Sequence, residues 1–473
     1  MVYCGKPSPA CFPCRTRKLR CDFHPGTCGQ CRRARLICHG YRDPDAVQFR
    51  DESQFVKQKN VARRGRYAYP ASNPTALELG WDARARYAFF STYIGGFTRS
   101  MGEVAHHYRT AGAFDHLSAS VETASLAFMA TQLGSPHLMR LANASYLTAV
   151  QRLSRGLPDL TPDRAEEALQ SVLLLDMYEK MAHRDPRTSQ SWISHAQGGL
   201  SILSTQTTSI ISSPTGCHLA ARLVTAVTVS CATVGVSTPG ELNLLRRNIG
   251  YRVRGPKWSF LGVLGRVSNL QLDMEKGAVS RSEFVVRARA LDDQLECLIR
   301  DLPLEWLPRK APAPEDDPNV LDDYYDVYPD HYTAQVINAL RTMRLIIYKL
   351  FDQYVPDHDY LGDERLRDGI RDSTRRICAS LPQFMLPWAS PENSLPFSAV
   401  QLLRCSTFLT PLYFVNQVTG DPSIRQWLAR CLRYMWESGG LRAAKDIEDI
   451  VKTSPDLGYW TVFAMTGSYA FAA

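Results

Sequence analysis

Six of the thirteen cysteines in this chain form two groups with identical spacing near its N-terminus. Each group reads Cys-x2-Cys-x6-Cys, and the second repeats the first 17 residues later: Cys11, Cys14, Cys21, Cys28, Cys31 and Cys38. No apolar secretory segment precedes them, so we expect a reducing compartment, where clustered cysteines are metal ligands and not disulfides. The repeat predicts two similar halves that bind metal together.

The number of thiolates indicates how that metal is shared. Zinc prefers four tetrahedral ligands in structural sites, so two ions need about eight bonds from six thiolates. Two sulfurs must therefore bridge, and the equivalent first cysteines, Cys11 and Cys28, are the natural pair. An alternative is one site made of both Cys-x2-Cys pairs, which leaves Cys21 and Cys38 unexplained. Cys4 lies outside the repeat, and we expect it to be a free thiol.

The elements that must position these cysteines are short. CFPCRTRKLRC and CGQCRRARLIC align over their whole length, and each predicts about two helical turns that begin at the Cys-x2-Cys pair. Between them, the adjacent Pro25 and Gly26 predict a turn. We therefore expect a small domain of two short helices and irregular loops over residues 1–42.

Positive charge is concentrated in the same part of the chain. Residues 1–70 carry 15 Lys and Arg against 5 Asp and Glu, whereas the remainder carries 40 against 42. A basic end on a near-neutral body indicates a polyanionic partner, with nucleic acid preferred over a membrane because no basic amphipathic helix accompanies it.

The cysteine segment resembles the fungal zinc binuclear-cluster (Zn2Cys6) family, through all six cysteines and the run CRTRKLRCD at residues 14–22. One departure is Gly26, where the family commonly has proline two residues before its fourth cysteine. The resemblance implies two Zn²⁺ ions and sequence-specific binding of double-stranded DNA at CGG triplets. It also implies a nuclear location and regulation of RNA polymerase II genes, as an activator of a pathway or metabolite gene cluster. A homodimer is compatible with it.

The resemblance also distributes the DNA contacts. Lys18 and its neighbour Arg17 would lie nearest the base edges, where Lys or Arg pairs with guanine. The remaining cations would mostly contact phosphate, which positions the protein without specifying a sequence: Arg15, Arg20, Arg32, Arg33 and Arg35. For Arg15 and Arg32 an equally good interpretation is that they offset the negative charge of the zinc thiolate cluster.

The rest of the chain reads as a linker followed by a helical body. Residues 43–79 are polar, predict no coiled coil, and include the basic group Arg63, Arg64 and Arg66, a candidate aid to nuclear import. Apolar residues at helical spacing then predict helices over 83–97, 136–157, 162–181, 281–302 and 331–354. We expect a large all-α domain at 80–473, with the apolar run at 223–236 as a buried helix and not a membrane span.

Four segments of this body are similar to the fungal-specific transcription factor regulatory domain: residues 173–181, 192–203, 290–306 and 327–345. The usual Arg-Gly after the second segment is missing, and Thr205 and Gln206 stand there. The resemblance implies that the body contacts the transcription machinery or senses a small molecule. The acidic segment 315–330 reads as a surface loop in preference to an activation patch.

No arrangement of residues in the body predicts catalysis. His195 reads as a satisfied core histidine, because no carboxylate or nucleophile stands at helical spacing from it. An enzyme is therefore not expected. The alternative to a DNA reader is an interaction or repressor protein in which zinc only staples the N-terminus, without base-specific reading.

Overall fold

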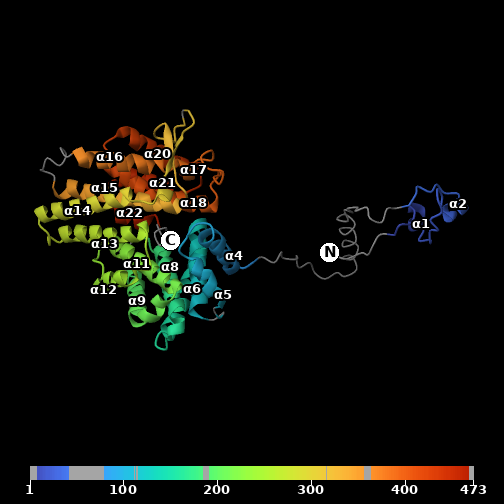
Figure 1. Cartoon of the computed structure of the whole chain (residues 1–473), viewed down its shortest axis with the longest axis horizontal. Coiled ribbons are helices and arrows are strands. Elements are labelled where there is room, and N and C mark those ends of the chain that lie inside the picture. Colours follow the sequence, from blue (N-terminus) through green and yellow to red (C-terminus); the bar gives the residue numbers. More distant parts are fainter. Residues whose placement is uncertain are drawn as a thin grey trace. The chain divides into compact units, whose positions relative to one another are not determined.

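The computed structural model describes residues 8–41 and 79–467, apart from residues 111, 113, 114, 185–190, 316 and 356–363. By its internal contacts the chain divides into two compact units, Met1–Glu78 and Leu79–Ala473 (Figure 1). Cys4, the basic group at residues 63–66 and nearly all of the predicted linker, residues 43–78, lie outside the described residues.

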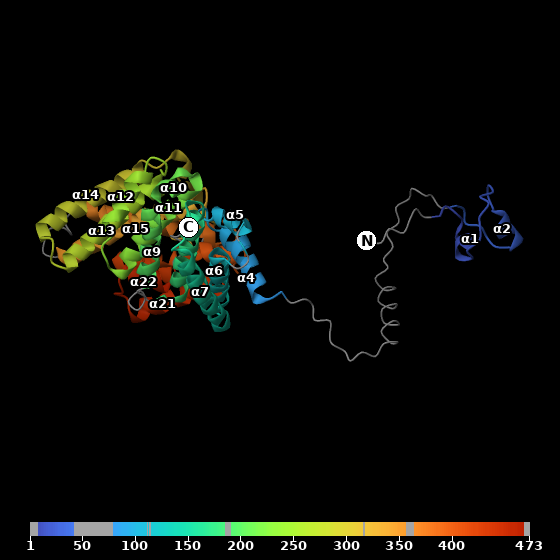
Figure 2. The ribbon, with the colours of Figure 1, turned by 90° about the horizontal axis from the view of Figure 1, so that it is seen from below.

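The first unit contains two short helices, α1 (Phe12–Thr16) and α2 (Gly29–Arg33), joined by irregular loops (Figure 2). Each has five residues, so the predicted length of two turns was too long. The cause lies one residue beyond each C-cap, where Lys18 and Arg35 both adopt a φ of 52°. A left-handed residue cannot continue a right-handed helix, so each helix ends there.

The second unit is mostly helical, as its apolar periodicity predicts. Its first half contains α4 (Trp81–Ala88), a π-helical segment (Phe89–Ile94), α5 (Gly102–Thr110), α6 (His116–Leu133), α7 (Pro136–Gly156), a 3₁₀ turn (Pro162–Arg164), α8 (Ala165–Ala182), α9 (Ser191–Thr205), α10 (Thr207–Ser212), α11 (Pro214–Val234) and α12 (Gly240–Ile249).

The second half of that unit continues the helical pattern. It contains α13 (Pro256–Glu275), α14 (Arg281–Arg300), a 3₁₀ turn (Leu304–Trp306), β1 (Arg309–Pro312), β2 (Tyr324–Val327), α15 (His331–Tyr354), α16 (Glu364–Ala379), α17 (Pro382–Met385), α18 (Ala399–Ser406), α19 (Leu409–Val418), α20 (Pro422–Glu437), α21 (Arg442–Thr453) and α22 (Tyr459–Met465).

Two long helices organise the second unit. Helix α11 contacts α8, α9, α10 and α12 of the first half and α13 and α22 of the second, so it links the two halves. Helix α15 is almost wholly buried and packs against α13, α14, α16 and α19, which places it at the centre of the second half (Figure 1). Helix α11 is long and apolar enough to span a membrane, but 83% of its most apolar window is buried inside the protein. It is a core helix here, as predicted.

The five predicted helices are found with small shifts at their ends. Pro136 does begin a helix, α7, with Ser135 as its N-cap, because a missing amide costs little in the first turn. Pro162 begins a 3₁₀ turn that leads into α8. The helix predicted at 83–97 is interrupted at Phe89, where i to i+5 bonding replaces the α pattern.

The acidic segment 315–330 is not only a surface loop, and in this respect the prediction was wrong. Strands β1 and β2 form an antiparallel pair with Arg309 opposite Val327 and Pro312 opposite Tyr324. In β2, Tyr325 and Asp326 are buried, and Tyr328 just beyond accepts a hydrogen bond from the Arg341 guanidinium of α15 at 2.7 Å. Part of this segment is buried because it contacts α15, a helix that follows it in the chain. The apolar periodicity of the sequence does not reveal such contacts.

A buried carboxylate in α21 gives a testable link between pH and stability. The Glu448 side chain accepts hydrogen bonds from Lys452, Arg433 and the Trp436 indole N–H at 2.8, 3.1 and 3.0 Å. The hydrogen bond from Lys452 is the largest cause that lowers the pKa of this carboxyl. Because Arg433 and Lys452 are themselves exposed, we expect Glu448→Gln to lower the free energy of unfolding by only about 1 kcal/mol at neutral pH.

The pH dependence of that difference has a definite sign. A carboxyl whose pKa is lower in the folded state stabilises the fold above its ordinary pKa, and the contribution disappears as pH falls through the folded value. Denaturant unfolding of both proteins should therefore give a constant difference from pH 6 to 8 that shrinks in acid. A difference that grows in acid would contradict the assignment.

Candidate zinc centre and nucleic-acid interface

The two helices of the first unit present their cysteines in the same way. Cys11 and Cys28 are the N-cap residues of α1 and α2, and Cys14 and Cys31 lie inside those helices, facing inward. The Cys28 sulfur also accepts a hydrogen bond from the Cys31 backbone N–H at 3.3 Å. The repeat seen in the sequence is thus a repeat in three dimensions.

The sulfur atoms are spaced as zinc requires. Tetrahedral zinc with Zn–S bonds of about 2.3 Å places its sulfurs about 3.8 Å apart. The Cys11 sulfur lies 3.7 Å from that of Cys28, 3.7 Å from that of Cys31 and 3.9 Å from that of Cys21, and those of Cys14 and Cys28 are 3.6 Å apart. These separations are far too long for disulfides, and all six cysteines are free thiols.

The six sulfurs form two overlapping sets of four. One set is Cys11, Cys14, Cys21 and Cys28, and the other is Cys11, Cys28, Cys31 and Cys38. Cys11 and Cys28 belong to both, as the bond count predicted, and the single-site alternative fails because Cys21 and Cys38 are also within ligand distance. The donor set fits two tetrahedral zinc ions with two shared sulfurs.

Most of these thiols must lose a proton before they can bind zinc, and their pKa values differ. Burial raises the pKa of the Cys31 thiol to about 12, and the neighbouring Cys28 and Cys11 thiols add to the increase. Hydrogen bonds from the backbone of Cys28 and Gly40 lower the pKa of Cys38 to about 7. Since zinc binds thiolates, loading the cluster at neutral pH releases protons.

Asp22 ties the two halves together. Its carboxylate accepts hydrogen bonds from the Gly29 backbone N–H at 3.0 and 2.9 Å, at the first residue of α2. This bond is the largest cause that lowers the pKa of Asp22. A Cβ on Gly29 would lie 2.4 Å from the carboxylate oxygen, so a larger residue there would displace the Asp22 side chain from this hydrogen bond.

The loop between the halves accounts for the departure at Gly26. Gly26 has a φ of 81°, which proline cannot adopt. The Tyr41 ring packs on Phe23 with ring centroids 5.4 Å apart, and the Tyr41 hydroxyl donates a hydrogen bond to the His24 carbonyl. The loop therefore differs in shape from a proline-containing one, while the cysteines keep their ligand geometry.

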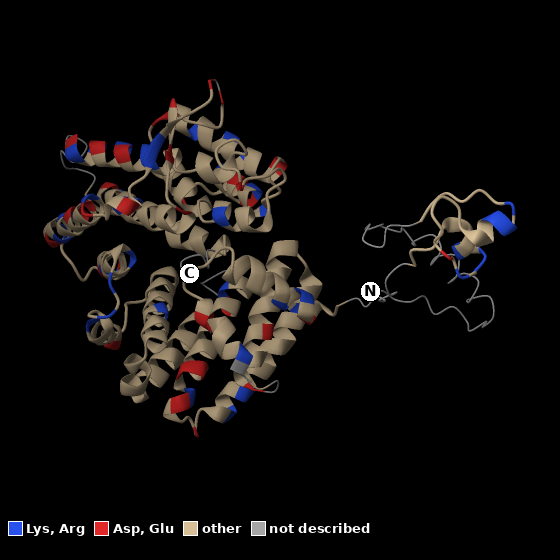
Figure 3. Cartoon of the chain, turned by 45° about the vertical axis from the view of Figure 1, so that its right-hand side comes forward, with Lys and Arg blue, Asp and Glu red and all other residues tan. Residues whose placement is uncertain are grey.

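Seven cations surround the cluster. Six are exposed and Arg15 is half-buried, and residues 8–41 contain one carboxylate, Asp22. Figure 3 shows this excess of Lys and Arg, in blue, over Asp and Glu, in red, in the small unit. In the described part of this unit, none of the seven forms an ion pair: Arg15, Arg17, Lys18, Arg20, Arg32, Arg33 and Arg35. Charges left in solvent without carboxylate partners are available to a polyanion.

Lys18 and Arg35 occupy equivalent backbone positions that the sequence did not reveal. Leu19 N–H bonds to Cys14 O and Leu36 N–H to Cys31 O, each at 2.9 Å, so each helix ends in a Schellman-type cap. Glycine normally occupies the left-handed position of such a cap, and a side chain there costs roughly 1–2 kcal/mol. The internal repeat pairs residues 18 and 35, and this pairing is the one sequence signal that indicated equivalent backbone positions.

This strain gives a stability prediction. Arg35→Gly should make the cluster more resistant to a zinc chelator, raising the chelator concentration for half-release about fivefold, because about 1 kcal/mol of backbone strain disappears. Zinc release from the full chain is the measurement. Ala34→Gly is the matched control, because Ala34 has an ordinary φ of −86° and gains nothing. Equal resistance in Arg35→Gly and the original protein would contradict the interpretation.

Comparison with known proteins agrees with this geometry. Residues 9–46 match the model of the fungal Zn(2)-Cys(6) binuclear cluster domain. No curated protein and no solved structure matches the chain. The N-terminal domain therefore binds two zinc ions through six cysteines, as this domain does in fungal DNA-binding transcription regulators.

The sequence predicts a structural and not a catalytic role for His195 of α9. Its Nε2 lies 3.0 Å from the Tyr146 hydroxyl and 3.7 Å from a Glu179 carboxylate oxygen. That carboxylate comes from α8, a different helix, so helical spacing could not have found it. The histidine is mostly buried, with a hydrogen bond to Tyr146 and a carboxylate nearby, as expected for a satisfied core or interface residue.

Proposed function

We propose that the zinc domain reads CGG-type triplets in double-stranded DNA, with Lys18 and Arg17 at the guanine edges. The observation that carries the proposal is the set of seven cations around a metal-clamped pair of helices, none of which pairs with a carboxylate of residues 8–41. Lys18 stands just beyond the end of α1 in a fixed left-handed conformation, so its side chain leaves a rigid point of the backbone. A positioned cation suits the paired N7 and O6 acceptors of guanine in the major groove.

The other cations hold the domain on the duplex. Arg15, Arg20, Arg32, Arg33 and Arg35 would contact phosphates, which supply affinity and register. If about five phosphates are neutralised, the logarithm of the binding constant should fall with the logarithm of salt concentration with a slope of about −4.5. Arg15 is half-buried beside the cysteines, so it also offsets the negative charge of the thiolates.

The rest of the proposal concerns the whole chain. Residues 1–42 form the DNA-binding domain, residues 43–79 a linker, and residues 80–473 a regulatory domain. The protein acts in the nucleus as an activator of RNA polymerase II genes, with secondary metabolite biosynthesis as the candidate pathway. Its proposed partners are a second copy of the chain, the transcription machinery and a small-molecule effector. The resemblance of the sequence to the zinc binuclear-cluster family supports these partners.

Selection of binding sites from random duplex DNA tests the central claim. The full zinc-loaded chain should enrich CGG triplets at physiological salt, with an affinity at least about a thousandfold above that for scrambled DNA. Weak binding that salt abolishes for every sequence alike would overturn base reading, and would favour the zinc-stapled interaction protein.

A further inference from the structure

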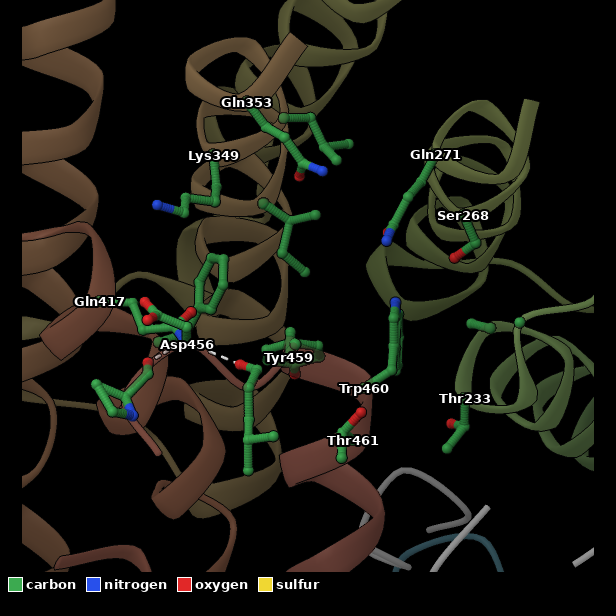
Figure 4. Close-up of a pocket in the computed structure, with 18 of the residues that line it drawn as sticks. Thr233, Ser268, Gln271, Lys349, Gln353, Gln417, Asp456, Tyr459, Trp460 and Thr461 are labelled. Atoms are coloured by element: carbon green, nitrogen blue, oxygen red, sulfur yellow. Dashed lines mark hydrogen bonds between the residues drawn. The ribbon is translucent and has the colours of Figure 1, made fainter. Parts of the chain in front are cut away.

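The helical unit contains a cavity of about 870 Å³, within the usual size range of small-molecule sites. It lies between the C-terminal end of α11, one face each of α13, α15 and α19, the start of α20, and the connection from α21 to α22 (Figure 4). On α15, the four residues of the lining follow helical spacing and so share one face: Ile346, Lys349, Leu350 and Gln353.

The deep part of the cavity is apolar and has a fixed shape. Phe414, Ile346 and Leu350 are buried side chains of its lining. The Trp460 ring is held by Tyr459 and Phe463, with ring centroids 4.9 and 5.5 Å away and the planes inclined by 84° and 74°. Edge-to-face contacts of this kind fix an aromatic ring in one orientation.

The segment that carries Trp460 is also held by hydrogen bonds. The Tyr413 hydroxyl and the Gln417 amide of α19 both donate to the Leu457 carbonyl, at 3.0 and 2.9 Å. Gln417 donates as well to the Pro455 carbonyl. The wall between α21 and α22 is therefore built before any ligand arrives, which lowers the entropic cost of binding.

One buried polar group in the lining has no hydrogen-bond partner among the described residues. Ser268 of α13 is 5% exposed, and its Oγ makes no hydrogen bond. Figure 4 shows this hydroxyl on the cavity side of α13, beside the Gln271 amide, with the Trp460 side chain reaching toward both. A buried hydroxyl without a partner costs free energy, and a ligand carbonyl or hydroxyl placed there would recover it.

The charges of the lining exclude a strongly ionic ligand. Four lining side chains carry charge, and all four are exposed at the rim: Glu275, Lys349, Arg425 and Asp456. Two are positive and two are negative, so the rim has no net sign, and none lies in the deep part. Moving an ionised group into that part would cost its hydration without a counter-charge.

We propose that this cavity binds a neutral aromatic small molecule of two or three rings that carries a carbonyl or hydroxyl group. The flat part lies between Trp460 and the apolar side chains of α15 and α19, and the polar group bonds to Ser268. The proposal does not depend on how the zinc domain reads DNA, because the cavity lies wholly within the helical unit.

Equilibrium dialysis of the full zinc-loaded chain tests the site with flavone, naphthol and coumarin as neutral probes, and a carboxylated flavone as the charged counterpart. At least one neutral probe should bind saturably with one site per chain, and the carboxylate should bind at least tenfold more weakly. Ser268→Ala should weaken that probe about fivefold, since one hydrogen bond is lost. Gln271→Trp changes a half-exposed position of the lining. The larger side chain should fill the cavity and weaken binding of the probe more than tenfold.

Ser230→Ala provides the matched control. Ser230 of α11 is also buried with an unpartnered hydroxyl, but it does not line the cavity, so probe binding should not change. Thermal unfolding separates binding from folding, because Ser268→Ala removes an unsatisfied hydroxyl and should not lower the melting temperature. The proposal is overturned if no neutral probe binds saturably, if the carboxylate binds as tightly, or if both cavity variants bind like the original protein.

Discussion

Replacing Cys28 by serine is expected to release both zinc ions, whereas replacing Cys38 is expected to release one. Cys28 belongs to both sulfur sets, so its loss removes a bond from each ion. Cys38 belongs to one set, and its loss leaves the four ligands Cys11, Cys14, Cys21 and Cys28 intact. Native mass spectrometry under a graded chelator should show the original protein with two zincs, Cys38→Ser with one and Cys28→Ser with none.

The functional consequence should be equally large. Within residues 8–41, few residues other than the cysteines are buried, so the metal supplies most of the folding free energy of this segment. Cys28→Ser should therefore lower affinity for a CGG site by roughly a thousandfold, to the level of non-specific binding. Cys231→Ser is a suitable control, because Cys231 is buried in α11 of the helical unit and belongs to neither sulfur set. Retention of two zincs by Cys28→Ser would show that its sulfur is not shared.

The second large effect is expected at Lys18. Lys18→Ala should lower affinity for a CGG site by up to about a hundredfold, because a good contact of Lys or Arg with guanine contributes roughly 1–3 kcal/mol of discrimination. Binding to scrambled DNA should fall much less, so the ratio between the two sites should collapse. Titrations of both duplexes at one stated salt concentration measure that ratio.

Arg33→Ala separates base reading from charge. Arg33 is exposed on α2 and is proposed to contact phosphate, so its removal should weaken binding to both duplexes by the same factor. It should also make the salt dependence shallower by about 0.9 in slope. If Lys18→Ala behaves in this same sequence-blind way, Lys18 does not contact a base.

The two proposals of this structure can fail independently. The cluster experiments address residues 8–41, and the cavity experiments address residues between Ala232 and Thr461. Loss of CGG discrimination would leave the cavity site intact, and absence of probe binding would leave DNA reading intact. If both hold, adding the bound probe to the DNA titrations would measure directly whether the helical body controls the zinc domain.

The sequence by itself determined the zinc centre almost completely. Ligand spacing is a local property, and a bond count from valence and repeat symmetry is enough to predict that Cys11 and Cys28 are shared. The periodic helices α7, α14 and α15 were also readable, because apolar spacing within one segment reports its buried face. Charge distribution likewise located the polyanion-binding end of the chain.

Only the tertiary structure decided the features that depend on distant partners. Strand β2 packs against α16 and α17, Tyr328 bonds to Arg341 of α15, and the partners of His195 come from α7 and α8. The left-handed backbone of Lys18 and Arg35 stands at the turn after each helix, from which the chain returns Cys21 or Cys38 to the cluster. The cavity beside Ser268 needs six segments from residues 232 to 461. Packing between segments far apart in the chain creates each of these features, and no local pattern of residues encodes such packing.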